Sequence, residues 1–104
     1  MVEIVSRDEL KKGLADGSIL LIDVREPDEF AAGHIPGAVS MPLSRFNPAD
    51  LPKVEGKTVV FNCRSGKRTL QAIDLARLGG RSDAHTHYAG SMLDWVAAGE
   101  PVEV

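Results

Sequence analysis

The stretch "VVFNCRSGKRTLQAI", residues 59–73, combines a strand, a loop and a helix in one short run of the 104-residue chain. Val59 to Asn62 is rich in β-branched and aromatic side chains, which is typical of a buried strand. The residues from Thr69 onward are helical by composition. The only cysteine of the chain, Cys63, falls where the strand ends. A strand that passes directly into a helix is the basic unit of an α/β fold.

The sequence on either side repeats this alternation of strands and helices. The segment "ILLID", Ile19 to Asp23, is a continuous apolar run of strand length, and Ser6 with Glu9 forms a capping box before a helix. The other expected elements are helices at about Arg7–Asp16, from Pro27 to a stop at Gly33, at Thr69–Leu78 and at Ser91–Ala98, and short strands at Ala38–Ser40 and within "DAHTHY", residues 83–88. We therefore predict an α/β domain with a mostly parallel sheet.

Length and composition limit the classes of function. A chain of 104 residues with 43% apolar and 26% charged residues is typical of one folded domain, residues 1–104. A formal net charge of −3 argues against a general nucleic-acid binder. The start "MVEIVSRDEL" predicts neither a signal peptide nor a membrane span, and one cysteine cannot form an internal disulfide. The expected location is the cytoplasm, with no nucleic acid and no membrane as partner.

The loop after Cys63 predicts an anion site. Ligands of open α/β sheets bind beyond the carboxyl ends of the strands, which is where Cys63 lies. Gly66 permits a positive φ, so successive backbone N–H groups can turn toward a bound anion. The candidate binding residues are Arg64, Ser65, Gly66, Lys67, Arg68 and Thr69, of which three are cationic and Ser65 or Thr69 can donate a hydroxyl. A cysteine pKa of ~8.5 falls to roughly 3.5–7.5 in such surroundings.

Cys63 has a simpler structural interpretation. A lone cysteine at the end of a strand is more often a small buried apolar residue than a reactive one. A buried structural cysteine, however, needs neither a glycine three positions later nor cations one, four and five positions later. The loop therefore favours a thiolate nucleophile that attacks a small anion.

Three segments in this order resemble the rhodanese family of sulfurtransferases, in its single-domain form. "LLIDVREPDEFAAGHIPGAVSMPL", residues 20–43, is similar to the N-terminal signature of the family. "VVFNCRSGKRT", residues 59–69, resembles its C-x-x-G-x-R loop, and "YAGSMLDWVAAGEPVE", residues 88–103, resembles its closing segment. The resemblance implies a three-layer domain with helices on both faces of the sheet.

The resemblance also implies a chemistry for Cys63. A persulfide would form on Cys63 by attack on the outer sulfur of thiosulfate or a similar donor, and would pass to a thiophilic acceptor, cyanide or a thiol. Backbone N–H groups from Arg64 to Thr69 would hold the terminal sulfur, without a metal or an organic cofactor. Arg64, Lys67 and Arg68 would attract the sulfonate, and Arg68 is the best candidate for a direct anion ligand. A partner protein in a sulfur relay is a further possible acceptor.

Other polar residues receive structural roles. Asp23, Arg25 and Glu29 follow a buried strand and open the next helix, and we expect an ion-paired network of structural importance there. His34 lies in a Pro- and Gly-rich connection and is expected to pack or to form hydrogen bonds. His85 and His87 alternate along a strand, but two histidines without a third ligand do not make a metal site.

Three alternative functions remain open or disfavoured. Related phosphatases and arsenate reductases carry five residues between cysteine and arginine, whereas four separate Cys63 from Arg68. A disulfide oxidoreductase is disfavoured because no second cysteine is present. A non-catalytic persulfide carrier or binding module would share every residue of the loop.

Overall fold

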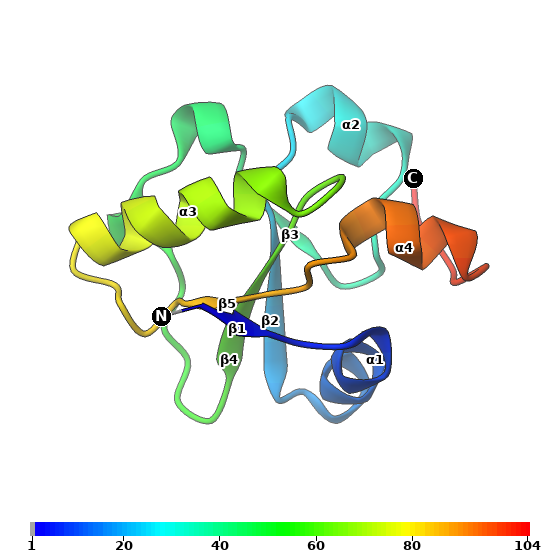
Figure 1. Cartoon of the computed structure of the whole chain (residues 1–104), viewed down its shortest axis with the longest axis horizontal. Helices are drawn as coiled ribbons and strands as arrows, with labels where there is room; N and C mark the ends of the chain where they lie inside the picture. The colour runs from blue at the N-terminus through cyan, green and yellow to red at the C-terminus, as the bar shows by residue number, and fades with distance from the viewer. Residues whose placement is uncertain (1) are drawn as a thin grey trace.

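The computed structural model describes residues 2–104 and contains one five-stranded sheet. The strands are β1 (Glu3–Ile4), β2 (Ile19–Asp23), β3 (Val39–Ser40), β4 (Thr58–Asn62) and β5 (Thr86–His87). The helices are α1 (Arg7–Asp16), α2 (Pro27–Ala32), α3 (Lys67–Leu78) and α4 (Ser91–Ala97), with two short 3-10 turns, η1 (Leu43–Arg45) and η2 (Pro48–Asp50). The strand order is β1-β5-β4-β2-β3, and every neighbouring pair is parallel (Figure 1). The expected α/β fold with a parallel sheet is confirmed.

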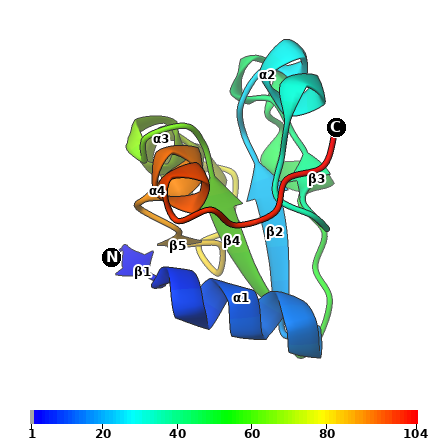
Figure 2. The same ribbon diagram turned by 90° about the vertical axis from the view of Figure 1, so that its right-hand side faces the viewer.

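Helices cover both faces of the sheet, which makes three layers. The alternating side chains of β4 explain this arrangement, because Val59 and Phe61 point to one face and Val60 to the other. The first face packs against α3 through residues such as Ile73, and the second packs against α1 and α4 through residues such as Leu10 and Trp95. Figure 2 shows α2 beyond the upper ends of β2 and β4. The carboxyl edge of the sheet is therefore surrounded by helices.

Local signals in the sequence account for several helix ends. The Ser6 hydroxyl accepts the Glu9 N–H at 3.1 Å, and the Glu9 carboxylate accepts the Ser6 N–H at 2.9 Å, which is the expected capping box. Pro27 is the first residue of α2, where its missing N–H costs no helical hydrogen bond. The helix bounds agree with the expected ones within two residues.

The differences from the expected elements lie at the sheet margin and at the start of α3. β1 was not predicted, because two exposed residues give no periodic pattern. β5 has two residues rather than the six of "DAHTHY". α3 begins at Lys67 rather than Thr69, so two of the three cations of the cysteine loop lie in the first helical turn. In the part of the chain described, no helix has both the length and the apolar character that a membrane crossing needs.

Candidate active site

Cys63 directly follows β4 and is almost completely buried. Its backbone N–H donates to the Ser91 hydroxyl at 3.2 Å, and its carbonyl accepts the Met92 N–H at 3.0 Å. The Cys63 sulfur accepts the Gly66 N–H at 3.0 Å. Three separate hydrogen bonds thus fix the backbone and the sulfur of this residue.

Gly66 gives the loop its shape. Its φ is +92°, in the left-handed region that favours glycine, and it precedes the first residue of α3. A Cβ at this position would lie 2.4 Å from the Ala89 carbonyl oxygen, so the loop is also pressed against the segment before α4. The N–H groups at the start of α3 have no partners within the helix, and those of Gly66 and Thr69 instead stabilise negative charge on the Cys63 sulfur.

The environment favours the thiolate of Cys63. Burial raises the pKa of the thiol, but hydrogen bonds from the Thr69, Gly66 and Ser65 backbone and from the Ser91 hydroxyl outweigh this effect, and the pKa is lowered from its ordinary value. Backbone N–H groups therefore supply most of the stabilisation of the thiolate that was expected from neighbouring cations. A thiolate held in this way is a ready nucleophile.

Ser91 is the contact that sequence reasoning missed. It is fully buried, its φ is +51°, and its hydroxyl accepts the Cys63 N–H. The hydroxyl oxygen lies 2.8 Å from the Tyr88 carbonyl oxygen and 3.8 Å from the Cys63 sulfur, so its single proton can be donated to either. The serine was expected only as the start of the last helix. Nothing local in the sequence indicates that this serine has a partner 28 residues earlier in the chain.

The expected ion-paired network is present in a different arrangement. The Arg25 guanidinium binds the buried Asp23 carboxylate, with Nη2 and Oδ2 2.8 Å apart. The Glu29 carboxylate binds Arg68 instead, at 2.6 and 3.0 Å, and this ion pair lowers the pKa of Glu29 to about 2. Arg25 reaches Glu29 only at its backbone carbonyl, at 3.3 Å. The network therefore joins α2 to α3.

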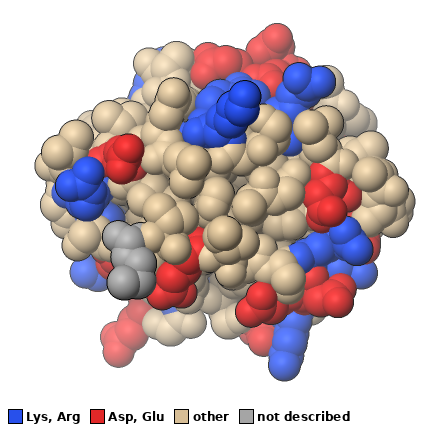
Figure 3. All heavy atoms as spheres, viewed as in Figure 1, with Lys and Arg blue, Asp and Glu red and all other residues tan. Residues whose placement is uncertain are grey.

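The six candidate binding residues differ in what they can offer a ligand. Arg64, Ser65 and Lys67 are exposed, and within residues 2–104 neither Arg64 nor Lys67 has a carboxylate at ion-pair distance. The Arg68 guanidinium is already paired with Glu29. The Thr69 hydroxyl is buried, donates to the Gly66 carbonyl at 2.8 Å and lies 2.7 Å from His87 Nδ1. Figure 3 shows basic side chains gathered over the loop before α3 and the start of that helix.

The three histidines have separate partners. His34 stacks on Phe30 and binds its carbonyl, which confirms the expected packing role. His87 is buried beside Thr69, whereas His85 lies near the surface, 3.1 Å from the Glu3 carboxylate. Among residues 2–104, no group of three or more His, Cys, Asp and Glu side chains is arranged to hold a metal ion.

Comparison with known proteins shows the family. The model of the rhodanese-like domain matches residues 6–98. The chain belongs to the rhodanese family. It is 41% identical over 106 residues to the human thiosulfate:glutathione sulfurtransferase, covering 88% of this chain and 91% of the human one. The solved structure of the human single-domain sulfurtransferase TSTD1 matches with a TM-score of 0.75 and 38% identity, over 93% of this chain and 97% of that one.

A cyanobacterial relative is longer. The chain is 45% identical over 84 residues to the uncharacterized protein slr1261 of Synechocystis, which covers 81% of this chain but only 46% of that protein. The chain thus spans about half the length of this relative and nearly the whole of the human one. These similarities assign the rhodanese chain to the enzymes of the sulfurtransferase type.

Proposed function

We propose that this rhodanese transfers a sulfane sulfur from thiosulfate to a thiol through a persulfide on Cys63. The observation that carries the proposal is the hydrogen bond from the Gly66 N–H to the Cys63 sulfur, within a loop that lowers the pKa of the thiol. The human and yeast relatives are both named thiosulfate:glutathione sulfurtransferase, which supports thiosulfate as the donor and glutathione as an acceptor. Cyanide would serve as the acceptor in an assay.

In the first half-reaction, the Cys63 thiolate attacks the outer sulfur of thiosulfate. A sulfur–sulfur bond forms to Cys63 while the sulfur–sulfur bond of thiosulfate breaks, and its electron pair leaves on sulfite. The exposed cation Lys67 attracts the dianion, whereas the charge of Arg68 is largely offset by Glu29. Backbone N–H groups between Ser65 and Thr69 stabilise the new terminal sulfur as they stabilise the thiolate.

Asp23, Arg25 and Glu29 act as structural supports in this proposal. The buried Asp23–Arg25 pair fixes the segment after β2, and Glu29 orients Arg68. The chain would work as a single rhodanese domain over residues 1–104. A reducing compartment such as the cytoplasm suits the chemistry, because the Cys63 thiolate must stay out of disulfides.

Steady-state turnover tests the proposal and separates an enzyme from a persulfide carrier. With thiosulfate and glutathione in excess, we expect many equivalents of sulfite per protein molecule, and none above background from Cys63→Ser. Release of a single equivalent of sulfite would instead indicate a carrier. No release with thiosulfate would exclude it as the donor.

A further inference from the structure

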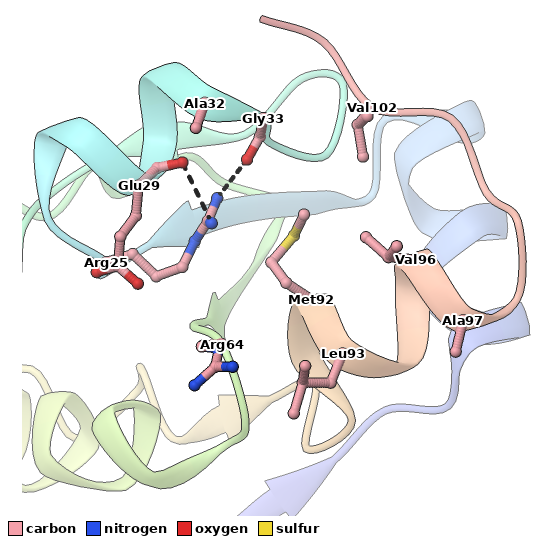
Figure 4. Close-up of a pocket in the computed structure, with 10 residues that line it drawn as sticks. All are labelled: Arg25, Glu29, Ala32, Gly33, Arg64, Met92, Leu93, Val96, Ala97 and Val102. Carbon is pink, nitrogen blue, oxygen red and sulfur yellow. Dashed lines mark hydrogen bonds between the residues drawn. The ribbon is translucent and has the colours of Figure 1, made fainter.

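A groove with a cavity volume of about 540 Å³ lies beside the Cys63 loop. Its walls come from the end of α2, from α4 and from the segment near the C-terminus (Figure 4). Met92, Val96 and Val102 make the wall apolar, and Val96 and Val102 are 58% and 47% exposed. Arg64 lies at one end of the groove, beside Leu93 (Figure 4).

The groove carries one unneutralised charge. Three ionisable residues line it, namely Arg25, Glu29 and Arg64. Arg25 is bound to Asp23, and Glu29 is bound to Arg68, so these two residues are already neutralised. No carboxylate within residues 2–104 lies at ion-pair distance from Arg64. The groove therefore matches a ligand that is partly apolar and carries a negative charge at one end.

Two backbone hydrogen bonds connect the wall of the groove to the cysteine loop. The Met92 N–H donates to the Cys63 carbonyl and the Leu93 N–H donates to the Arg64 carbonyl, each at 3.0 Å. The first turn of α4 thus contributes both to the wall of the groove and to the backbone of the loop. Arg64 follows Cys63 in the chain, so a ligand held by Arg64 lies beside the cysteine loop.

We propose that this groove binds the sulfur acceptor, a low-molecular-weight thiol that carries a carboxylate, and that Arg64 binds this carboxylate. The inference rests on the proposed persulfide chemistry, and it assigns the sulfur donor and the sulfur acceptor to different residues. Arg64 would serve mainly the acceptor, whereas Lys67 and the backbone N–H groups would serve the donor. Glutathione and cysteine belong to the proposed class, and cysteamine, which has no carboxylate, does not.

The step in the groove is a thiol–persulfide exchange. The acceptor loses its proton to water, and its thiolate attacks the terminal sulfur of the Cys63 persulfide. A sulfur–sulfur bond forms to the acceptor, the bond between Cys63 and the terminal sulfur breaks, and the electron pair stays on Cys63 as a thiolate. The products are the acceptor persulfide and the original enzyme, so no external oxidant or reductant is needed.

The two half-reactions are measured separately. The protein is loaded with thiosulfate, freed of excess donor and mixed with glutathione or cysteamine in a rapid-quench experiment. We expect Arg64→Gln to slow transfer to glutathione by about tenfold or more, because a charge-assisted hydrogen bond is lost. Transfer to cysteamine and loading by thiosulfate should change less than about threefold. Lys57→Gln, which removes an exposed cation next to the opposite end of β4, is the matched control and should change neither half-reaction.

A pair of substitutions at Val96 tests the groove without touching Arg64. Val96→Glu and Val96→Lys replace the same exposed apolar side chain with charges of opposite sign. The glutamate should slow transfer to glutathione and the lysine should not, with the opposite order for cysteamine. Equal effects on both acceptors, or equal effects of Arg64→Gln on both half-reactions, would overturn the acceptor assignment. Failure of the wild-type protein to load would overturn the proposed function and this inference with it.

Discussion

The Cys63 sulfur accepts hydrogen bonds, and this distinguishes it from a cysteine that only fills space. Its N–H, carbonyl and sulfur are bound to Ser91, Met92 and Gly66 respectively. Neutral backbone donors rather than cations supply most of the stabilisation of the thiolate. Because these donors are part of the fold, they need no reorganisation when negative charge appears on sulfur.

Substitution of Ser91 tests whether its hydroxyl stabilises the Cys63 thiolate. Replacing it with alanine or glycine removes the hydroxyl, so the pKa of Cys63 should rise and the alkylation rate of Cys63 should reach its half-maximum at a higher pH. Only glycine favours the φ of +51°. Equal shifts in both variants would assign the effect to the hydroxyl, and an unchanged pH profile in both would show that Ser91 has no influence on the thiolate.

The predictability of site residues depended on how far apart their partners lie in the sequence. Cys63, Gly66 and the cations occupy six consecutive positions, so their pattern was visible. The Glu29–Arg68 ion pair joins residues 39 positions apart, and the contact of Ser91 with Cys63 spans 28. Such pairings follow from packing of α2, α3 and α4, which a pattern in one sequence does not contain.

At the level of elements, the site depends on the close approach of the loop before α3 to the segment before α4. Gly66 lies against Ala89, and the first turn of α4 binds the carbonyls of the loop. The parallel strands β4 and β5 place both segments at the same edge of the sheet. Movement of either segment would change the hydrogen bonds to Cys63.

Substituting Gly66 with alanine should disrupt this contact. The new Cβ would meet the Ala89 oxygen at 2.4 Å in addition to the cost of a positive φ, so we expect a loss of about 2–4 kcal/mol in the free energy of unfolding. Gly80→Ala is the matched control, because its φ is +83° and no atom lies within 4 Å of the added Cβ. That variant should lose only about 1 kcal/mol in urea denaturation. Similar losses in both variants would contradict the proposed contact.

Strong local signals made most elements of the fold predictable. β2 and β4 are apolar runs of strand length, and α1 has a capping box. β1 and β5 have two residues each, and they form because they pair with each other and with β4. Such short strands are products of tertiary pairing and carry little signal of their own.

Considered as a whole molecule, the chain brings α2, α3 and α4 together around the carboxyl edge of one parallel sheet. Cys63 and the groove lie at this edge, and the sole cysteine of the chain is the proposed sulfur carrier. A mass change on sulfur therefore reports on one residue without interference from other thiols.

The intact mass of the protein after brief exposure to thiosulfate tests whether Cys63 carries a persulfide. We expect the addition of one sulfur atom, located on Cys63 by fragmentation, removed by cyanide and absent in Cys63→Ala. An unchanged mass with thiosulfate and with polysulfide, under conditions in which Cys63 is still alkylated, would contradict a persulfide mechanism.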